Sequence, residues 1–228
     1  MKTGVHPLAG ILAAVARAVS GVQIRRSQDF TETLRQRIYF ANHTSHLDFV
    51  VLWSVLPAEA RARTRPVAAK DYWGRGVKGY LAQSVFRAVL VKRGGAAQAT
   101  SKEEARAAGR AVVEQLAMAM SESQSLILFP EGTRGTGETV APFRSGLYHL
   151  AMSKPEAELL PVYLENLNRI LPKGELLPVP LISSLTFGAP FRVNEGEGKD
   201  AFLNRARAAL CGLHQGVKHD DRAAGLYP

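Results

Sequence analysis

The sequence predicts a single α/β domain with a mainly parallel sheet that helices cover on both faces. Three observations lead to this prediction. The 228 residues fit one domain with one sizeable core. Short apolar runs, typical of strands buried on both faces, alternate with stretches of helical periodicity. Two polar motifs directly follow two of these runs, as happens where neighbouring strands of an open α/β sheet end at one edge.

The first expected element is a helix within residues 1–26. Its apolar side chains form a narrow stripe at helical spacing: Leu8, Ile11, Leu12, Val15, Val19 and Val22. Arg17 interrupts the segment too early for a membrane-spanning helix, which needs about 20 apolar residues, and Ala18-Val19-Ser20 is a poor signal-peptide cleavage site. We therefore expect an amphipathic helix at a membrane interface, with Arg25 and Arg26 behind it. The alternative is a helix packed on the core.

Residues 27–228 are expected to form the domain itself. Apolar runs predict strands at 38–41, 65–70, 88–92, 125–129, 159–164 and 184–187. Helical patterns between and after them predict helices at 48–56, 76–86, 101–120, 146–153 and 201–213. Pro57 ends the first of these helices and places Asp48 in its first turn. Ser101 and Glu104 form a capping box that opens the third.

The two polar motifs hold the candidate functional residues. The first, Asn42 to Asp48, follows the first strand and contains His43. A histidine accepts a proton at neutral pH, and an aspartate can orient it. The second motif, Phe-Pro-Glu-Gly-Thr-Arg, follows the strand at 125–129 and supplies Glu131 and Arg134. These charged residues are suited to holding an anionic group beside the histidine.

Several of these residues have competing interpretations. His46 is a rival base, but it lies only two residues from Asp48 and is expected to point elsewhere. Ser45 lacks the Gly-x-Ser-x-Gly turn of a nucleophile and is expected to cap the helix. Glu131 and Arg134 would form a loop-stiffening ion pair in the structural interpretation, which is compatible with phosphate binding. Gly132 would let a ligand approach the backbone closely.

A net charge of +9 predicts an anionic partner. The cations are concentrated in one segment: Arg61, Arg63, Arg65, Lys70, Arg75, Lys78, Arg87, Lys92 and Arg93. Tyr72, Trp73, Tyr80 and Phe86 lie among them, a mixture typical of the headgroup level of an anionic membrane surface. A solvated basic face is the plain alternative. No nucleic-acid partner is expected, because no known nucleic-acid-binding spacing accompanies the charges.

Other chemistries find little support in the sequence. Gly74 to Gly79 spells G-x-G-x-x-G, but the strand, turn and acidic residue of a dinucleotide site are missing around it. No Cys/His cluster has metal-ligand spacing, so no metal is expected. The single cysteine, Cys211, excludes an intrachain disulfide and favours a reducing compartment.

Together, the motifs resemble those of the glycerolipid acyltransferases, typified by the 1-acyl-sn-glycerol-3-phosphate (lysophosphatidic acid) acyltransferases. The first family block, His-x4-Asp preceded by Asn, matches Asn42, His43 and Asp48. The third block matches Phe129 to Arg134 and then Phe143 to Gly146. Weaker second and fourth blocks are similar to 89–93 and 160–162, so the resemblance covers roughly residues 35–165.

The resemblance implies a glycerol-3-phosphate acyltransferase-like fold and an enzyme that acylates the free hydroxyl of a lysophospholipid, most simply 1-acylglycerol-3-phosphate. His43 would be the general base and Asp48 its orienting partner. The residues implied in binding the acceptor phosphate are Glu131, Gly132, Thr133, Arg134, Arg93 and Arg144. The acyl donor would be a thioester of acyl carrier protein or coenzyme A, with no cofactor.

The apolar stripe, the basic segment and the single cysteine together predict a peripheral or monotopic protein at the cytoplasmic face of the cell membrane. Two alternatives remain open at this point. In the first, the acceptor would be another lysolipid, such as a lyso-lipoamino acid, because the polar stretch 165–174 departs from the family pattern. Otherwise the chain is a basic lipid-binding protein without catalytic activity, against which the intact His43 and Asp48 argue.

Overall fold

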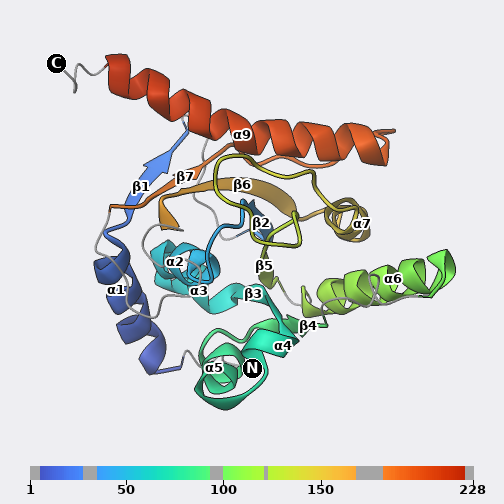
Figure 1. Ribbon diagram of the computed structural model, residues 1–228, viewed down its shortest axis with the longest axis horizontal. Helices are drawn as coiled ribbons and strands as arrows, with labels where there is room; N and C mark the ends of the chain where they lie inside the picture. Colours follow the sequence, from blue (N-terminus) through green and yellow to red (C-terminus); the bar gives the residue numbers. More distant parts are fainter. Residues whose placement is uncertain (1–5, 28–34, 93–99, 121–122, 168–181, 224–228) are drawn as a thin grey trace.

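The computed structural model describes residues 6–27, 35–92, 100–120, 123–167 and 182–223, and of 215–223 the backbone alone. A seven-stranded sheet at its centre has the order β1-β7-β6-β2-β5-β3-β4 (Figure 1). Its strands are β1 Gln23–Arg26, β2 Arg37–Ala41, β3 Thr64–Ala69, β4 Val89–Val91, β5 Ser125–Leu128, β6 Glu158–Glu165 and β7 Ser184–Phe187. All neighbouring pairs are parallel except β6 and β7. The expected mainly parallel α/β fold is confirmed.

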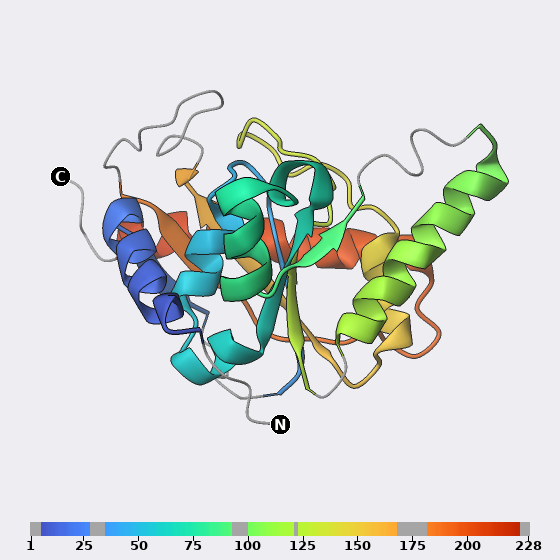
Figure 2. The same cartoon turned by 90° about the horizontal axis from the view of Figure 1, so that it is seen from below.

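Helices cover both faces of the sheet, as expected. On one face lie α1 Leu8–Ser20, α2 Asp48–Val55 and the π-helix η1 Leu81–Val85; on the other lie α6 Lys102–Ala119, α7 Gly146–Ser153 and α9 Lys199–Ala223. Three short helices complete the described set: α3 Ala58–Arg63, α4 Lys70–Trp73 and α5 Gly76–Tyr80. Figures 1 and 2 show α1 and α6 at opposite ends of the molecule.

The side chains of β2 explain why this strand lies in the middle of the sheet. All five of its residues are buried. Tyr39 and Ala41 belong to the apolar cluster under α1 and α2, whereas Ile38 and Phe40 belong to the cluster under α7 and α9. Successive strand side chains point to opposite faces, so a strand covered on both sides has apolar residues facing each side. The charged residue of β2, Arg37, is buried in an ion pair with Glu158.

Some elements differ from the sequence prediction. The helix expected at 76–86 divides into α5 and η1, because the Phe86 N–H donates to the carbonyl of Leu81, a π-type bond, at 2.9 Å. Strand β1 was not predicted, since its sequence Gln-Ile-Arg-Arg has no apolar pattern. It pairs with β7 at the sheet edge, so the segment 1–26 contains a strand as well as the expected helix.

Helix α1 presents two different faces. Ala9 and Ala13 are buried in the core beside α2. Four side chains of the predicted stripe are exposed, with Ile11 at 62% and Val15 at 52%, whereas Leu12 and Val22 pack against the core. Arg17 donates to the carbonyl of Ser54 at 2.8 Å. The helix is therefore fixed to the domain by small residues while most of its apolar stripe stays uncovered. Within the described residues, no helix has the length and apolar character needed to cross a bilayer.

Candidate active site

The two polar motifs meet at one edge of the sheet. Strands β2 and β5 are parallel neighbours, with Phe40 opposite Leu128 near their carboxyl ends. The chain leaves β2 into residues 42–48 and leaves β5 into residues 129–134, so the two loops lie side by side. This placement follows from topology, because parallel strands that share a sheet end at the same edge.

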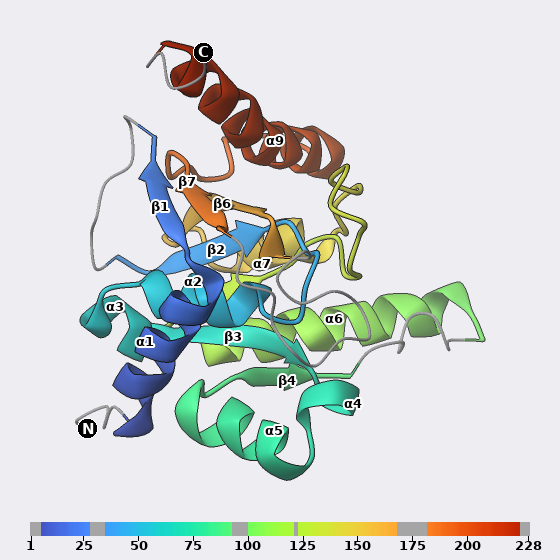
Figure 3. The same ribbon diagram turned by 60° about the vertical axis from the view of Figure 1, so that its left-hand side comes forward.

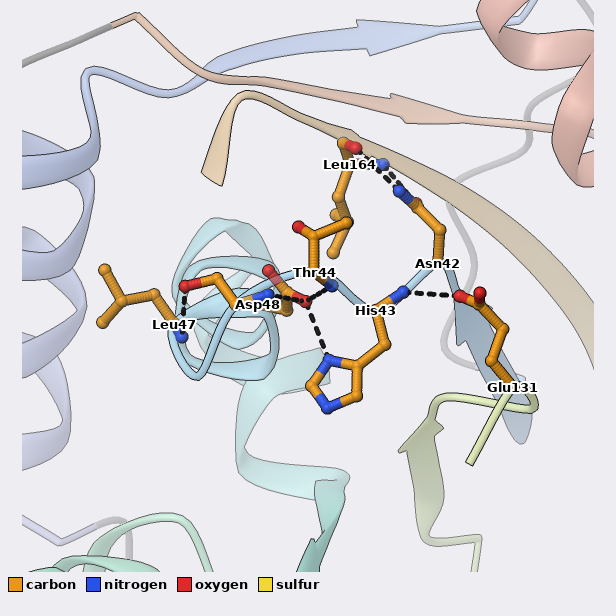
Figure 4. A network of polar contacts seen from close by, with 8 residues as sticks. Asn42, His43, Thr44, Leu47, Asp48, Glu131 and Leu164 are labelled. Carbon is orange, nitrogen blue, oxygen red and sulfur yellow. Dashed lines mark hydrogen bonds and ion pairs between the residues drawn. The ribbon is translucent and has the colours of Figure 1, made fainter. Parts of the chain in front are cut away.

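His43 and Asp48 form a hydrogen-bonded pair (Figure 4). His43 Nδ1 lies 2.8 Å from Asp48 Oδ2. The same oxygen accepts the backbone N–H groups of Thr44 at 2.6 Å and Ser45 at 2.8 Å. The Asp48 side chain is fully buried, whereas that of His43 is 14% exposed. An ionised carboxylate only accepts, so the proton lies on Nδ1 of the neutral imidazole and Nε2 carries the lone pair.

The position of Asp48 agrees with its prediction in the first turn of a helix, since α2 begins at that residue. Its carboxylate reaches back to the turn that precedes the helix and closes it. Negative charge is favourable at a helix N-terminus. The hydrogen bond between the imidazole and the carboxylate thus forms within one short turn of the chain.

The second motif fixes the ring and backbone of His43. The imidazole stacks on Phe129, with ring centroids 4.3 Å apart and planes 19° from parallel. The His43 N–H donates to Glu131 Oε1 at 2.8 Å, and its carbonyl accepts from the Gly135 N–H at 2.8 Å. Both backbone polar groups of the histidine are therefore bound by the loop after β5.

Glu131 connects two loops through its carboxylate. Besides the His43 N–H at Oε1, it accepts the Ala141 N–H at Oε2, also at 2.8 Å. The residue is buried, at 5% exposure. Both residues of the anticipated Glu131–Arg134 ion pair are described, and no such pair is present. The interpretation as a stiffening ion pair was therefore wrong, although Glu131 does stiffen the site through backbone hydrogen bonds.

Asn42 extends the pairing of β2 with β6 beyond the last backbone pair. Its side-chain amide donates to the Leu164 carbonyl at 2.9 Å and accepts the Leu164 N–H at 2.8 Å. The residue is 4% exposed. A side-chain amide has one donor and one acceptor group, as a backbone peptide does. The Asn42 side chain therefore makes the two hydrogen bonds to Leu164 that a further strand residue would make through its backbone. It anchors the chain immediately before His43.

The residues expected to bind the acceptor phosphate differ in burial and in their contacts. Gly132 has φ +76°, and a Cβ there would overlap the Arg144 side chain. The glycine thus makes room for Arg144, whose Nε donates to the Glu131 carbonyl at 3.3 Å. Arg134 is half-buried, and no described residue bonds to its side chain. Thr133 is exposed beside it. Arg93 lies outside the described residues.

His46, the rival base, has other contacts. Its ring stacks on Tyr72, with centroids 3.9 Å apart and planes within 4°. The ammonium of Lys78 lies 3.9 Å from the centre of the same Tyr72 ring. Ser45 is 2% exposed, and its hydroxyl accepts the Leu47 N–H at 3.3 Å just before α2. The ring bonded to the Asp48 carboxylate through Nδ1 is that of His43.

The cations between residues 59 and 93 divide into two groups. Arg61 and Arg87 donate to carbonyl oxygens of residues 54, 56 and 62, Arg65 donates to the Arg87 carbonyl, and Arg63 pairs with Glu59. Burial, followed by a neighbouring arginine, lowers the pKa of Arg61 and Arg65. A second group is exposed: Lys70, Arg75, Lys78 and Lys92. Lys70 and Lys92 follow β3 and β4 at the same sheet edge as His43.

The described ranges contain no group of three or more His, Cys, Asp or Glu residues that could hold a metal ion.

Known proteins resemble the chain in both sequence and fold. The model of a family described as "Acyltransferase" matches residues 11–165. Two 1-acyl-sn-glycerol-3-phosphate acyltransferases of the plants Limnanthes douglasii and Limnanthes alba are 29% and 30% identical, over 75% and 68% of this chain. The chain spans only 56% and 50% of these relatives.

A human relative and a solved structure extend the comparison. The human 1-acyl-sn-glycerol-3-phosphate acyltransferase alpha is 24% identical over 90% of this chain and 68% of its own length. The crystal structure of the 1-acyl-sn-glycerophosphate (LPA) acyltransferase PlsC from Thermotoga maritima aligns with a TM-score of 0.66. It covers 91% of this chain and 77% of that one at 17% identity, a likeness of fold alone.

Proposed function

The chain belongs to the acyltransferase family, and on that basis we propose that it moves a fatty acyl group from a thioester to the free hydroxyl of a lysophospholipid. The preferred acceptor is 1-acylglycerol-3-phosphate, which would become phosphatidic acid, in keeping with the names of the relatives. The observation that carries the proposal is the bond between His43 Nδ1 and the buried carboxylate of Asp48. It leaves Nε2 as a proton acceptor on a partly exposed ring.

His43 would act as general base for direct attack by the acceptor. The acceptor hydroxyl transfers its proton to Nε2 as its oxygen forms a bond with the thioester carbonyl carbon. Asp48 stabilises the resulting imidazolium, as the carboxylate of an acyl-transfer triad does. The carbon–sulfur bond then breaks, and the thiolate leaving group takes the proton from Nε2. The products are an ester and a free thiol, and the histidine returns to its neutral form.

Two arginines are the best-placed candidates for the acceptor phosphate. Arg134 and Arg144 both belong to the loop that fixes His43, and guanidinium groups bind phosphate with paired hydrogen bonds. Thr133, Gly132 and Arg93 stay in the candidate set from the family resemblance. Glu131 is less suited to an anion, because both of its oxygens already accept backbone N–H groups.

The acceptor and its product are lipids, so we propose peripheral binding to an anionic membrane surface at the cytoplasmic face. The uncovered stripe of α1 and the exposed cations near the site support this. The thioester donor is carried by acyl carrier protein or by coenzyme A.

The test is an acyl-transfer assay with the purified full chain. Each thioester donor is combined with lysophosphatidate, with other lysophospholipids and with a lyso-lipoamino acid. The proposal predicts fastest transfer to lysophosphatidate, with release of one thiol per ester formed. Fastest transfer to another lysolipid would replace the acceptor. No transfer to any acceptor would favour a lipid-binding protein without catalytic activity.

A further inference from the structure

Helix α5 carries a second uncovered apolar surface. Val77 is 76% exposed and Tyr80 is 52% exposed. They are three positions apart and therefore lie on one side of a helical turn. The helix starts at Gly76, whose φ of +59° separates it from α4 and is a conformation that glycine adopts without strain. The chain thus turns sharply and presents two large side chains to solvent.

This surface is joined to the uncovered stripe of α1. His6 lies just before α1, and its Nε2 is 3.2 Å from the hydroxyl oxygen of Tyr80. The two rings meet edge to face. Figures 1 and 3 show α1 and α5 on the same side of the molecule, away from α9. We call the combined set the α1–α5 surface: Leu8, Ile11, Val15, Val19, Val77 and Tyr80. It holds six of the ten large apolar side chains that are exposed in the described residues.

The charges around α5 complement an anionic partner. Arg75 and Lys78 are both exposed and flank Val77, and Lys70 is exposed one helix earlier. The segment 70–80 contains one acidic residue, Asp71, against the three cations Lys70, Arg75 and Lys78. Long basic side chains beside apolar and tyrosine side chains match the boundary between lipid headgroups and acyl chains, where cations reach phosphates while apolar groups leave water.

We propose that α5 is a second membrane-contact element that binds an anionic bilayer together with α1. The inference rests on the proposed function, in which the acceptor is a membrane lipid. Contact along one amphipathic helix constrains the orientation of the domain less than contacts at two separate elements do. The stack of His46 on Tyr72 links the segment before α5 to the loop of His43. The second contact would therefore hold the mouth of the site at the lipid surface.

The test compares full-length variants with matched controls in vesicle co-sedimentation. Val77→Ser removes the most exposed side chain of α5. Met118→Ser removes one of nearly equal exposure, 77%, on α6, which covers the opposite face of the sheet. Vesicles contain phosphatidylcholine with or without phosphatidylglycerol. Val77→Ser should weaken partition into both vesicle types by about fivefold, and Met118→Ser should leave it unchanged.

A charge pair tests the anionic partner separately. Arg75→Ser should weaken binding to phosphatidylglycerol vesicles alone, whereas Arg110→Ser on the exposed side of α6 should have a much smaller effect. Equal losses in the two variants would reflect net charge and overturn the assignment to α5. Wild-type binding by Val77→Ser would also overturn it. A third result would overturn it as well: a wild type that is dimeric and a Val77→Ser variant that is monomeric but binds vesicles normally. A second copy of the chain would then cover the surface.

Failure of this inference is distinguishable from failure of the proposed function. Acyl transfer to a short-chain lysophosphatidate below its critical micelle concentration does not require a bilayer. Val77→Ser should keep the wild-type rate there. Absence of transfer by the wild type would contradict the proposed function, whatever the vesicle assays show.

Discussion

His43 has one orientation because contacts from three residues, on two segments of the chain, converge on it. Asp48 holds the ring at Nδ1, Phe129 stacks on its face, and Glu131 accepts its backbone N–H. The pair of His43 and Asp48 could be predicted from its spacing together with the second motif, and both residues belong to one short turn. The roles of Glu131 and Asn42 could not be predicted, because their partners are backbone groups of residues distant in the sequence.

Arg134→Ala should mainly weaken acceptor binding. A phosphate would lose charge-assisted hydrogen bonds of roughly 1.5–3 kcal/mol, so the KM for lysophosphatidate should rise by about tenfold or more. An acceptor without phosphate should be affected far less, and Arg106→Ala on α6 serves as a control. Equal losses with the charged and uncharged acceptors would refute a phosphate contact by Arg134.

Gly132→Ala should destabilise the protein and reduce its activity. The backbone there has φ +76°, and the added methyl group would displace the Arg144 side chain. The expected loss is about 1–3 kcal/mol in the free energy of unfolding. Gly109→Ala is the matched control: Gly109 lies in α6 with open space around it, so stability should rise by roughly 0.5–1 kcal/mol. In urea unfolding, the free energy of unfolding should fall in Gly132→Ala and rise in Gly109→Ala. A change in the same direction for both variants would contradict the strain expected at Gly132.

At the scale of elements, strongly patterned segments were predicted closely and weakly patterned ones were missed. Helix α6 begins as its capping box indicates, with the Glu104 N–H bonded to Ser101 Oγ at 3.1 Å. Helix α3 was missed because six polar and small residues carry no apolar stripe. The outward face of α1 shows the limit of periodicity. The stripe identified a helix, but Ala9 and Ala13, which are not part of it, are the residues of α1 buried in the core.

Helix α9 offers an element-scale test of pH dependence. Hydrogen bonds from Arg205 lower the pKa of Glu197. A lowered pKa contributes stability above the unfolded value of about 4.3, and this contribution is lost as pH falls through the folded value. Glu197→Gln should therefore reduce the free energy of unfolding by about 1–2 kcal/mol at pH 7. The gap between wild type and variant should shrink between pH 5 and pH 3 in urea unfolding. A difference in the free energy of unfolding that grows as the pH falls would contradict a stabilising role of the ionised Glu197.

At the scale of the whole molecule, topology brings the chemistry together. Strands β2, β3, β4 and β5 are mutually parallel, so His43, the Glu131 loop and two exposed lysines all follow carboxyl ends at one sheet edge. The alternation of strands and helices predicted this edge. The order of the strands and the antiparallel pairing of β7 depend on contacts between distant segments, which no local pattern contains.

The apolar stripe of α1 can be tested without removing the helix, which contributes buried residues to the core. Ile11→Ser with Val15→Ser changes only exposed positions and should leave the thermal midpoint near that of the wild type. Vesicle binding should fall at low and at high salt, because burial of apolar area is insensitive to screening. Raising salt should instead weaken the wild type on anionic vesicles alone. Unchanged binding of the double variant would mean that the stripe does not contact lipid.

We propose that His43, and not His46, is the base of an acyl-transfer reaction. The most direct measurement is the rate of acyl transfer to lysophosphatidate by His43→Phe and His46→Phe. Each substitution keeps a ring to stack on Phe129 or Tyr72 but removes the ring nitrogens. We expect the rate to fall by about 10²–10⁴-fold in His43→Phe and to stay near that of the wild type in His46→Phe, with both proteins folded by circular dichroism. Near-wild-type turnover by His43→Phe with loss in His46→Phe would contradict it.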